Sequence, residues 1–211
     1  MPEQFFVTGT DTGIGKTVVS ALLCASLEAT YWKPIQTGTR DGTDTKTVMR
    51  LAKLPRQRVV PELYRFAPPV SPHLAAKLAG VRIALDRIRL PRTLKSENLI
   101  VEGAGGVLVP INERYLMVDL MKRLKLPVVL VSRTSLGTIN HTLLSLAALR
   151  LAKLAIRGVV LVGKKNRENR LAIEQYGQVK VVGWVPFLRK IDRAALLRIF
   201  HNEFDRRAFS E

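Results

Sequence analysis

Cysteine is nearly absent from this chain of 211 residues, and long uncharged apolar runs are absent altogether. The single Cys24 cannot form an internal disulfide, so the chain is not a small disulfide-linked secreted domain. The longest uncharged segment, Thr134 to Leu149, contains Asn140, His141 and several hydroxyl residues, which excludes a membrane span there. Met1-Pro2-Glu3-Gln4 leads straight into the first apolar stretch, so no signal peptide is expected. These features predict a cytoplasmic protein.

Acidic residues are also scarce. Seventeen Asp and Glu stand against 34 Lys and Arg, giving a formal net charge of +17. Such a balance raises nucleic acid or an anionic membrane as partners. However, the basic residues are spread along the chain, and the densest piece, Lys164 to Arg170, has no aromatic residue for base stacking. We therefore expect a solvated basic surface and no nucleic-acid or membrane partner. A nucleic-acid-binding module remains a rival whose affinity would fall steeply with salt.

What the chain does have is a glycine loop near its start. The apolar run Phe5-Phe6-Val7 leads into Thr8-Gly9-Thr10-Asp11-Thr12-Gly13-Ile14-Gly15-Lys16-Thr17, and a helical segment, Val18 to Leu27, follows. Strand, glycine loop and helix in this order are typical of a phosphate-binding loop, in which backbone N–H groups and the helix N-terminus surround a polyphosphate. Thr10 stands where the common pattern has its first glycine. We expect ATP to bind at Gly13, Ile14, Gly15, Lys16, Thr17 and Val18.

Apolar runs alternate with amphipathic segments along the whole chain. Strands are expected at 29–33, 98–102, 127–131, 158–162 and 179–183, and helices at 18–27, 45–53, 71–79, 84–94, 118–125, 138–153, 169–176 and 192–206. The stretches 35–43, 54–70 and 184–187 are expected to be loops or irregular connections. This alternation predicts a doubly wound, mostly parallel sheet flanked by helices, similar to P-loop NTPases, with residues 1–211 forming a single domain.

Two further motifs fall directly after predicted strands. Lys33 precedes Pro34, which favours an extended backbone at Lys33 and places it at the carboxyl end of its strand. Glu102 ends another strand and is followed by Gly103-Ala104-Gly105-Gly106, where the backbone must approach something closely. Ligands bind at the carboxyl ends of strands in open α/β sheets, so both motifs are expected near the glycine loop.

Taken together, these stretches resemble the dethiobiotin synthetase family over nearly the whole chain. The resemblance rests on the glycine loop, on Lys33-Pro34, on Ser71-Pro72-His73-Leu74-Ala75-Ala76, on Glu102 to Gly106 and on Leu136-Gly137-Thr138-Ile139-Asn140-His141-Thr142-Leu143-Leu144. It implies a ligase that uses ATP and Mg²⁺ to carboxylate 7,8-diaminopelargonate with CO₂ and to close the ureido ring of dethiobiotin, in biotin biosynthesis.

The resemblance also implies roles for individual residues. Lys16 and Lys33 would be catalytic cations beside the carbamate and the γ-phosphate. Thr17, Asp44 and Glu102 would supply the oxygen ligands that Mg²⁺ favours. The substrate would contact Thr12, Lys33, Thr37, Leu136, Gly137 and Asn140, the last three in a loop that reaches a neighbouring subunit of a homodimer. Further nucleotide contacts would come from Asp44, Glu102, Gly103, Ala104, Gly105, Val162, Gly163, Pro186, Phe187 and Leu188.

Three positions depart from the family pattern. Gly13 stands where the family often has a glutamate, and Val162 where an asparagine usually contacts adenine. The segment Phe187-Leu188-Arg189-Lys190 is more basic than the base-contacting loop commonly is. Two of the proposed site residues also have a simpler interpretation. Asp44 could be only a helix cap, and Lys33 could be only a surface cation.

Several other residues have structural explanations, and one other class of protein fits the glycine loop. Glu102, if buried, requires a metal or a lysine partner. His73 and His141 lack the spacing of a zinc site and more simply fix loops, while Met117, Met121 and Leu124 form a core stripe. The rival of another class is a partition-type ATPase acting as a regulatory protein. Such ATPases usually carry a second lysine early in the glycine loop, and Thr10-Asp11-Thr12 has none.

Overall fold

The computed structural model describes residues 2–91, 93–94 and 97–209. A sheet of seven strands runs through the molecule in the order β4-β2-β6-β1-β7-β8-β9, and every recorded strand pair in it is parallel. Its strands are β1 (Gln4–Gly9), β2 (Thr30–Trp32), β4 (Val59–Val60), β6 (Leu99–Glu102), β7 (Val128–Arg133), β8 (Ile156–Val162) and β9 (Val181–Val185). A separate parallel pair joins β3 (Ile35–Thr37) to β5 (Tyr64–Phe66).

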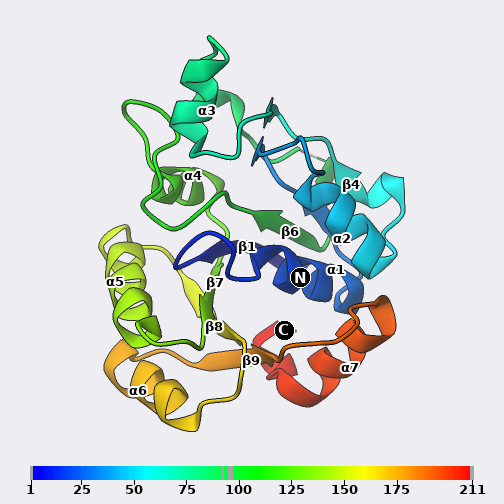
Figure 1. Cartoon of the computed structure of the whole chain (residues 1–211), viewed down its shortest axis with the longest axis vertical. Helices are drawn as coiled ribbons and strands as arrows, with labels where there is room; N and C mark the ends of the chain where they lie inside the picture. Colours follow the sequence, from blue (N-terminus) through cyan, green and yellow to red (C-terminus); the bar gives the residue numbers. More distant parts are fainter. Residues whose placement is uncertain (1, 92, 95–96, 210–211) are drawn as a thin grey trace.

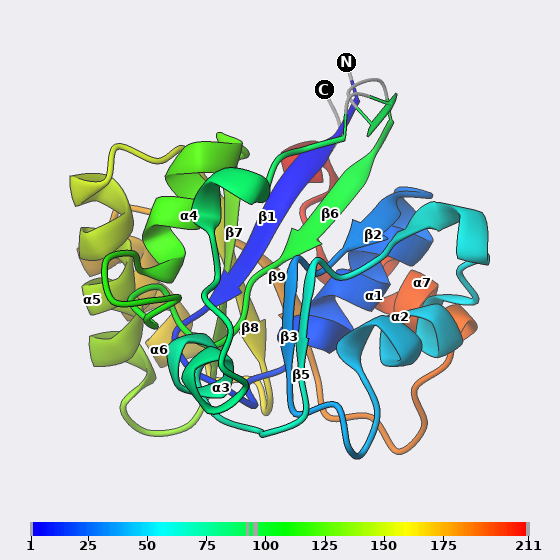
Figure 2. The ribbon, with the colours of Figure 1, turned by 90° about the horizontal axis from the view of Figure 1, so that it is seen from above.

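Helices cover both faces of the large sheet (Figures 1 and 2). One face carries α1 (Lys16–Ser26), α2 (Asp44–Ala52) and α7 (Arg193–Glu203), and the other carries α4 (Met117–Leu124), α5 (Thr138–Leu151) and α6 (Arg167–Gly177). The short α3 (Pro72–Leu78) lies beside the β3–β5 pair, and 3-10 turns form at Arg56–Arg58, Leu85–Arg87 and Arg206–Phe209, among others. Two apolar cores, one on each face, result from this layering. Among the described residues, none of the helices has the length and apolar character needed to cross a bilayer.

Strand register brings the conspicuous motifs of the sequence to one edge of the sheet. Val7 of β1 lies opposite Glu102 of β6, and Trp32 of β2 lies opposite Val101 of the same strand. Since these strands are parallel, their carboxyl ends meet at the same edge. The glycine loop, Lys33 and Glu102 therefore follow directly from three adjacent strands.

The doubly wound, parallel α/β architecture is confirmed, but several predicted segments were wrong. No α-helix forms over the described part of 84–94, where the carbonyl groups of Asp86 and Ile88 accept hydrogen bonds from Arg123 instead of from a helical turn. The stretches 35–43 and 54–70 contain the short strands β3, β4 and β5. Trp184 and Val185, expected in a loop, complete β9. The last helix ends at Glu203 instead of Arg206, because Phe204 forms a bridge with Gly183.

Candidate active site

The glycine loop wraps around the ammonium group of its own lysine. Gly13 and Gly15 adopt φ angles of +69° and +102°, in the left-handed region that favours glycine, and Gly15 is the N-cap of α1. Lys16 turns back over the loop, and its Nζ donates to the carbonyl oxygen of Asp11 at 2.6 Å. Burial and then the neighbouring Lys33 lower the pKa of Lys16 to about 8. The loop thus places a cation at the N-terminal end of α1, where a polyphosphate would bind.

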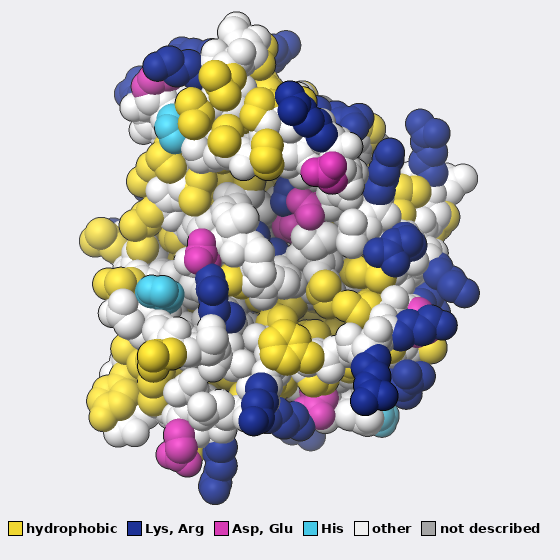
Figure 3. Space-filling view, in the orientation of Figure 1, with side chains coloured by type: hydrophobic (Ala, Val, Ile, Leu, Met, Phe, Trp, Pro, Cys, Tyr) yellow, Lys and Arg dark blue, Asp and Glu magenta, His cyan; other side chains and the backbone are white. Residues whose placement is uncertain are grey.

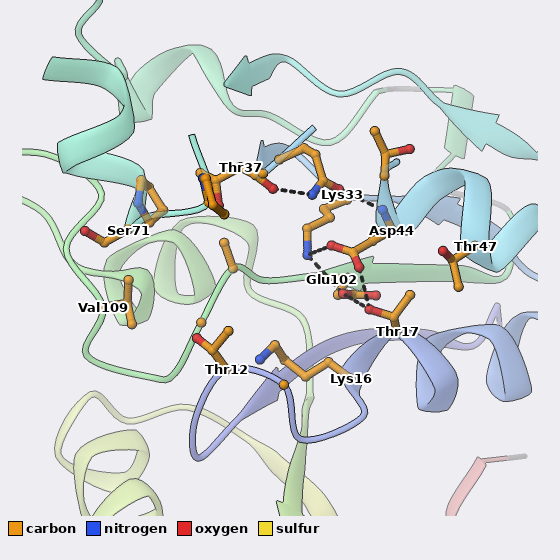
Figure 4. A pocket seen from close by; sticks show the side chains of 18 of the residues that line it. Thr12, Lys16, Thr17, Lys33, Thr37, Asp44, Thr47, Ser71, Glu102 and Val109 are labelled. Atoms are coloured by element: carbon orange, nitrogen blue, oxygen red, sulfur yellow. Dashed lines mark hydrogen bonds and ion pairs between the residues drawn. The ribbon is translucent and has the colours of Figure 1, made fainter. Parts of the chain in front are cut away.

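Four polar side chains from four segments meet beside this loop (Figure 4). Lys33, 4% exposed, lies with its Nζ 2.9 Å from Asp44 Oδ2 and 2.9 Å from Glu102 Oε1. The Thr17 hydroxyl lies 2.8 Å from Asp44 Oδ1 and 3.1 Å from Glu102 Oε1. Glu102, only 1% exposed, thus has the lysine partner that a buried carboxylate requires. We call Thr17, Lys33, Asp44 and Glu102 the cation cluster.

The charges of the cation cluster support one another. Burial alone would lower the pKa of Lys33, but the Glu102 and Asp44 carboxylates outweigh it and raise that pKa above its usual value. Burial would likewise raise the pKa of Asp44, and Lys33 outweighs it and lowers that pKa. Lys33 is therefore a fixed cation at neutral pH and not a proton acceptor. The interpretation of Lys33 as a surface cation is wrong.

Asp44 does more than cap a helix. It is the first residue of α2, and the N-cap is Thr43, whose hydroxyl accepts the N–H of Lys46 at 3.1 Å. The backbone N–H of Asp44 donates to Gln36 Oε1 at 3.0 Å, which ties the start of α2 to β3. The Asp44 carboxylate is left free to face Lys33 and Thr17.

A pocket of about 590 Å³ opens in front of the cation cluster. Figure 3 shows acidic and basic side chains within a hollow on this face of the molecule. The walls come from the glycine loop, the β3–α2 connection, the start of α3 and the Glu102–Gly106 loop. The pocket brings together many of the predicted site residues, namely Thr12, Gly13, Gly15, Lys16, Thr17, Lys33, Thr37, Asp44, Glu102, Ala104 and Gly105. Gly103 joins them through its carbonyl oxygen, 3.2 Å from Lys33 Nζ.

A second pocket, of about 700 Å³, adjoins the other side of the glycine loop. It shares Gly13 and Gly15 with the first pocket, and Ile14, Val162 and the largely exposed Phe187 also line it. The Val162 side chain has only apolar atoms. Four other predicted nucleotide contacts do not line this second pocket, namely Val18, Gly163, Pro186 and Leu188.

The chain is similar to known proteins along nearly its whole length. A family model described as an AAA domain matches residues 3–195. The ATP-dependent dethiobiotin synthetase BioD of Nitrobacter hamburgensis is 48% identical over 204 residues, which cover 97% of this chain and 95% of that protein. The enzyme of the same name from Rhodopseudomonas palustris strain BisB18 is 47% identical and covers 100% of both chains. This chain belongs to the dethiobiotin synthetase family.

Solved structures support the fold alone. The cell division ATPase MinD of Pyrococcus furiosus aligns with a TM-score of 0.54 and 18% identity, covering 94% of this chain and 88% of that one. A ParA family ATPase of Chlorobium tepidum aligns with a TM-score of 0.52 and 11% identity, covering 95% of this chain and 93% of that one. Identities this low carry no functional argument, so the family assignment rests on the dethiobiotin synthetases.

Three of the predicted substrate residues lie outside the first pocket, the one in front of the cation cluster. Leu136, Gly137 and Asn140 are not among its lining residues. Leu136 is fully exposed, and Asn140 lies on the exposed side of the first turn of α5. A third pocket of about 450 Å³ lies close by, between the glycine loop, residues 106–110 and α5. Within one chain, these three residues therefore lie apart from the other predicted substrate contacts, Thr12, Lys33 and Thr37, which line the first pocket.

Sequence reasoning missed several residues of this region. Tyr31 donates its hydroxyl proton to Glu102 Oε2 at 3.0 Å, and Gln36 holds the start of α2. Arg133, at the end of β7, pairs with Asp11 of the glycine loop at 2.6 Å. The sequence does contain a signal for Tyr31. Residues two apart in an extended segment share a face, and Tyr31 lies two residues before Lys33, so its side chain is expected on the same side as that of Lys33. The contact between Arg133 and Asp11 has no comparable signal.

Proposed function

We propose that this chain is an ATP- and Mg²⁺-dependent ligase that joins CO₂ to 7,8-diaminopelargonate and closes the ureido ring to give dethiobiotin, in biotin biosynthesis. The observation that carries the proposal is the convergence of two lysines, Lys16 and Lys33, on one pocket that follows a phosphate-binding glycine loop. Membership of the dethiobiotin synthetase family supports it. The reaction passes through two anions, a carbamate and a transferring phosphoryl group, and fixed cations stabilise both.

The cation cluster fits Mg²⁺ by the chemistry of its donors. The described residues hold no group of three or more His, Cys, Asp or Glu side chains that could bind a metal. Mg²⁺ needs fewer, since it commonly takes one or two carboxylates, waters and substrate phosphates. Thr17, Asp44 and Glu102 provide a hydroxyl and two carboxylates, and both carboxylates already face one cation, the Lys33 ammonium. Mg²⁺ bound there would neutralise charge on the phosphates of ATP.

The nucleotide is expected to lie across the two adjoining pockets. The backbone N–H groups of Gly13 to Thr17, with Val18 behind them, would surround the phosphates, and Lys16 would reach the β- and γ-phosphates. The purine would lie near Val162, Gly163 and the segment Pro186-Phe187-Leu188. Phe187, 82% exposed, offers a ring face on which a base can stack. The Gly103-Ala104-Gly105 turn would let the backbone approach the reacting groups.

In the first step an amine of the substrate attacks CO₂, forming a C–N bond and releasing a proton, to give a carbamate. A carbamate oxygen then attacks the γ-phosphorus of ATP, and ADP leaves. The second amine attacks the carbamoyl carbon, the C–O bond to phosphate breaks, and the ring closes with loss of a proton. Lys33 would stabilise the carbamate charge, and Lys16 the γ-phosphoryl charge. Thr12 and Thr37, which line the same pocket, would orient the substrate through their hydroxyl groups.

The active unit is proposed to be a cytoplasmic homodimer without a nucleic-acid or membrane partner. Leu136, Gly137 and Asn140 of one subunit would complete the substrate pocket of the other. The exposure of Leu136 and Leu144 supports this, because large apolar side chains at a surface are typical of protein interfaces. Basic side chains spread along the edge of the face seen in Figure 3 and form no single block.

The deciding experiment is a turnover assay with the purified full chain, 7,8-diaminopelargonate, bicarbonate, ATP and Mg²⁺. Dethiobiotin identified by mass spectrometry, with one ADP formed per product, is the expected result. Omitting the diamine should abolish ADP release. ADP release at the same rate with and without the diamine, and no dethiobiotin, would contradict the proposal and favour a regulatory ATPase.

A further inference from the structure

A buried tyrosine stands behind the cation cluster. Tyr31, the middle residue of β2, has no exposed surface, and its ring belongs to the apolar core on the α1 face. In the parallel register Tyr31 lies opposite Ile100 of β6. Glu102 is two residues beyond Ile100 and therefore shares its face of β6. A long side chain reaches such a diagonal neighbour, and the Tyr31 hydroxyl lies 3.0 Å from Glu102 Oε2.

This contact divides the two oxygens of Glu102 between different partners. Oε1 faces the cation cluster, where it accepts from Lys33 at 2.9 Å and lies 3.1 Å from the Thr17 hydroxyl. Oε2 faces the core, and Tyr31 is the one donor recorded for it within the described part of the chain. A carboxylate can rotate about its terminal bond, because that torsion has broad minima. With Tyr31 bonded to Oε2, rotation would break a buried hydrogen bond.

We propose that Tyr31 is a positioning residue that orients Glu102 so that Oε1 faces the metal of a bound metal–nucleotide complex. This proposal rests on one part of the proposed function, namely that a metal–nucleotide complex binds at the cation cluster. Mg²⁺ demands near-ideal octahedral geometry, so the orientation of a ligand determines how well it contributes. Partners that hold metal ligands in place typically alter metal affinity by about 10–100-fold when they are removed.

The test replaces Tyr31 by phenylalanine, which keeps the ring and removes the hydroxyl. Mn²⁺ stands in for Mg²⁺, and its affinity for the protein–ADP complex is measured from the electron paramagnetic resonance signal of free Mn²⁺. Tyr31→Phe should weaken Mn²⁺ binding about tenfold and raise the Mg²⁺ concentration for half-maximal turnover in parallel. The affinity for ADP without metal should change by less than about twofold, since Tyr31 does not line either nucleotide pocket.

Tyr64→Phe is the matched control. The Tyr64 hydroxyl accepts the N–H of Ala84 at 3.0 Å instead of bonding to a member of the cation cluster, and Tyr64 is likewise buried. This variant should lose stability while keeping its Mn²⁺ affinity. Equal losses of Mn²⁺ affinity in both variants, or an unchanged affinity in Tyr31→Phe, would overturn the proposal. Equal losses would mean that Tyr31 acts only through the stability of the protein, and an unchanged affinity would mean that Tyr31 has no effect on metal binding.

A double variant covers the case in which Tyr31→Phe does not fold. In Tyr31→Phe the Glu102 oxygen Oε2 loses its hydrogen-bond donor, and Glu102→Gln removes the negative charge that makes this loss costly. Tyr31→Phe/Glu102→Gln is therefore compared with Glu102→Gln alone. If Tyr31 acts through Glu102, the two should bind Mn²⁺ within about twofold of each other. A further loss in the double variant would contradict the proposal. The Mn²⁺ and ADP binding measurements do not use the diamine, so a chain that binds Mn²⁺–ADP but makes no dethiobiotin would refute the proposed function and leave Tyr31 testable by binding alone.

Discussion

Lys33 is the residue whose surroundings differ most from those of an ordinary surface lysine. It is 4% exposed and lies 2.9 Å from each of two carboxylates. A buried cation with two anionic partners costs little to keep charged, and its long side chain is held in one place. Preorganisation of this kind is what stabilises charge that develops in a transition state.

Lys33→Ala should therefore lower turnover by at least about a hundredfold, because removing one preorganised charge-stabilising group costs on the order of 10²–10³ in rate. Steady-state kinetics checks this. Removing one partner of a buried ion pair also costs about 3–5 kcal/mol of stability, so rates are compared at a temperature where circular dichroism shows both proteins folded. Lys46→Ala, an exposed lysine of α2, is the control and should keep its turnover. A Lys33→Ala variant with a third of wild-type turnover would remove Lys33 from the catalytic residues.

Val162 leads to a second prediction at this scale. An asparagine amide can read adenine through two hydrogen bonds, but valine has no polar side-chain atom. The adjacent main chain is already engaged, since Gly163 N–H donates to the carbonyl of Val185 at 2.9 Å and its carbonyl accepts from the Trp184 indole at 2.9 Å. Stacking on Phe187 does not distinguish bases well. GTP or CTP should therefore support turnover within about tenfold of ATP, a gap of roughly 1.4 kcal/mol.

The measurement compares kcat/KM for ATP, CTP and GTP at saturating diamine. Val162→Asn is the complementary variant, and it should increase the preference for ATP by roughly 1–3 kcal/mol, the value of a good bidentate pair. A wild-type preference for ATP above about a hundredfold over both other nucleotides, equal to roughly 2.7 kcal/mol, would contradict the prediction and point to base contacts elsewhere in the second pocket.

At the scale of elements, the start of α2 connects stability to the site. Thr43 is the N-cap, and its hydroxyl accepts the N–H of Lys46, while Asp44 in the next position contacts Lys33. Thr43→Ala should lower the free energy of unfolding by about 1 kcal/mol, as loss of an N-cap does. It should also lower kcat/KM severalfold, because Asp44 then lies on a frayed turn. Urea denaturation and steady-state kinetics give the two quantities.

Asp119→Ala provides the control for Thr43→Ala. The Asp119 carboxylate accepts the N–H of Leu116 at 2.9 Å at the start of α4, which contributes no residue to either nucleotide pocket. It should show a similar loss of stability and unchanged kinetics. If Thr43→Ala lost stability but kept wild-type kcat/KM, the cap would serve the helix and not the position of Asp44.

The predictable elements were those with a strong local pattern. The strand, glycine loop and helix at the start, the apolar run before Glu102 and the Lys33-Pro34 strand end follow from short-range chemistry. The β3–β5 pair could not be predicted in this way, because strands as short as Ile35–Thr37 are stabilised by pairing with a distant segment. The segment 84–94 failed for a related reason, since Arg123 of α4 takes carbonyl groups that a helix would need.

The same distinction applies to the candidate site. Lys16, Lys33, Asp44 and Glu102 lie next to strand ends or helix starts, so sequence could place them near one another. Which oxygen of Glu102 faces Lys33 depends on the register of β2 against β6 and on Tyr31, which no local pattern encodes. The pairing of Arg133 with Asp11 likewise depends on two segments 122 residues apart.

At the scale of the whole molecule, the predicted substrate contacts do not all line one pocket of the chain. Leu136, Gly137 and Asn140 lie at the start of α5, and none of them lines the main pocket. Leu136 exposes its entire side chain. A two-fold dimer that covers this surface would bury Leu136 and would contribute the same residues to each site, because both subunits use the same patch in such an interface.

Mixing two variants tests whether the site is shared. Lys16→Ala and Asn140→Ala should each have little activity alone. In a two-fold dimer formed from one subunit of each, one site carries both substitutions and the other carries neither. If subunits exchange at random, half of the dimers are mixed, and the mixture should recover about a quarter of wild-type turnover. Lys16 and Asn140 acting within the same subunit would give no recovery. Subunit exchange is verified by native mass spectrometry with one variant isotopically labelled, so an inactive mixture that contains mixed dimers would contradict a shared site.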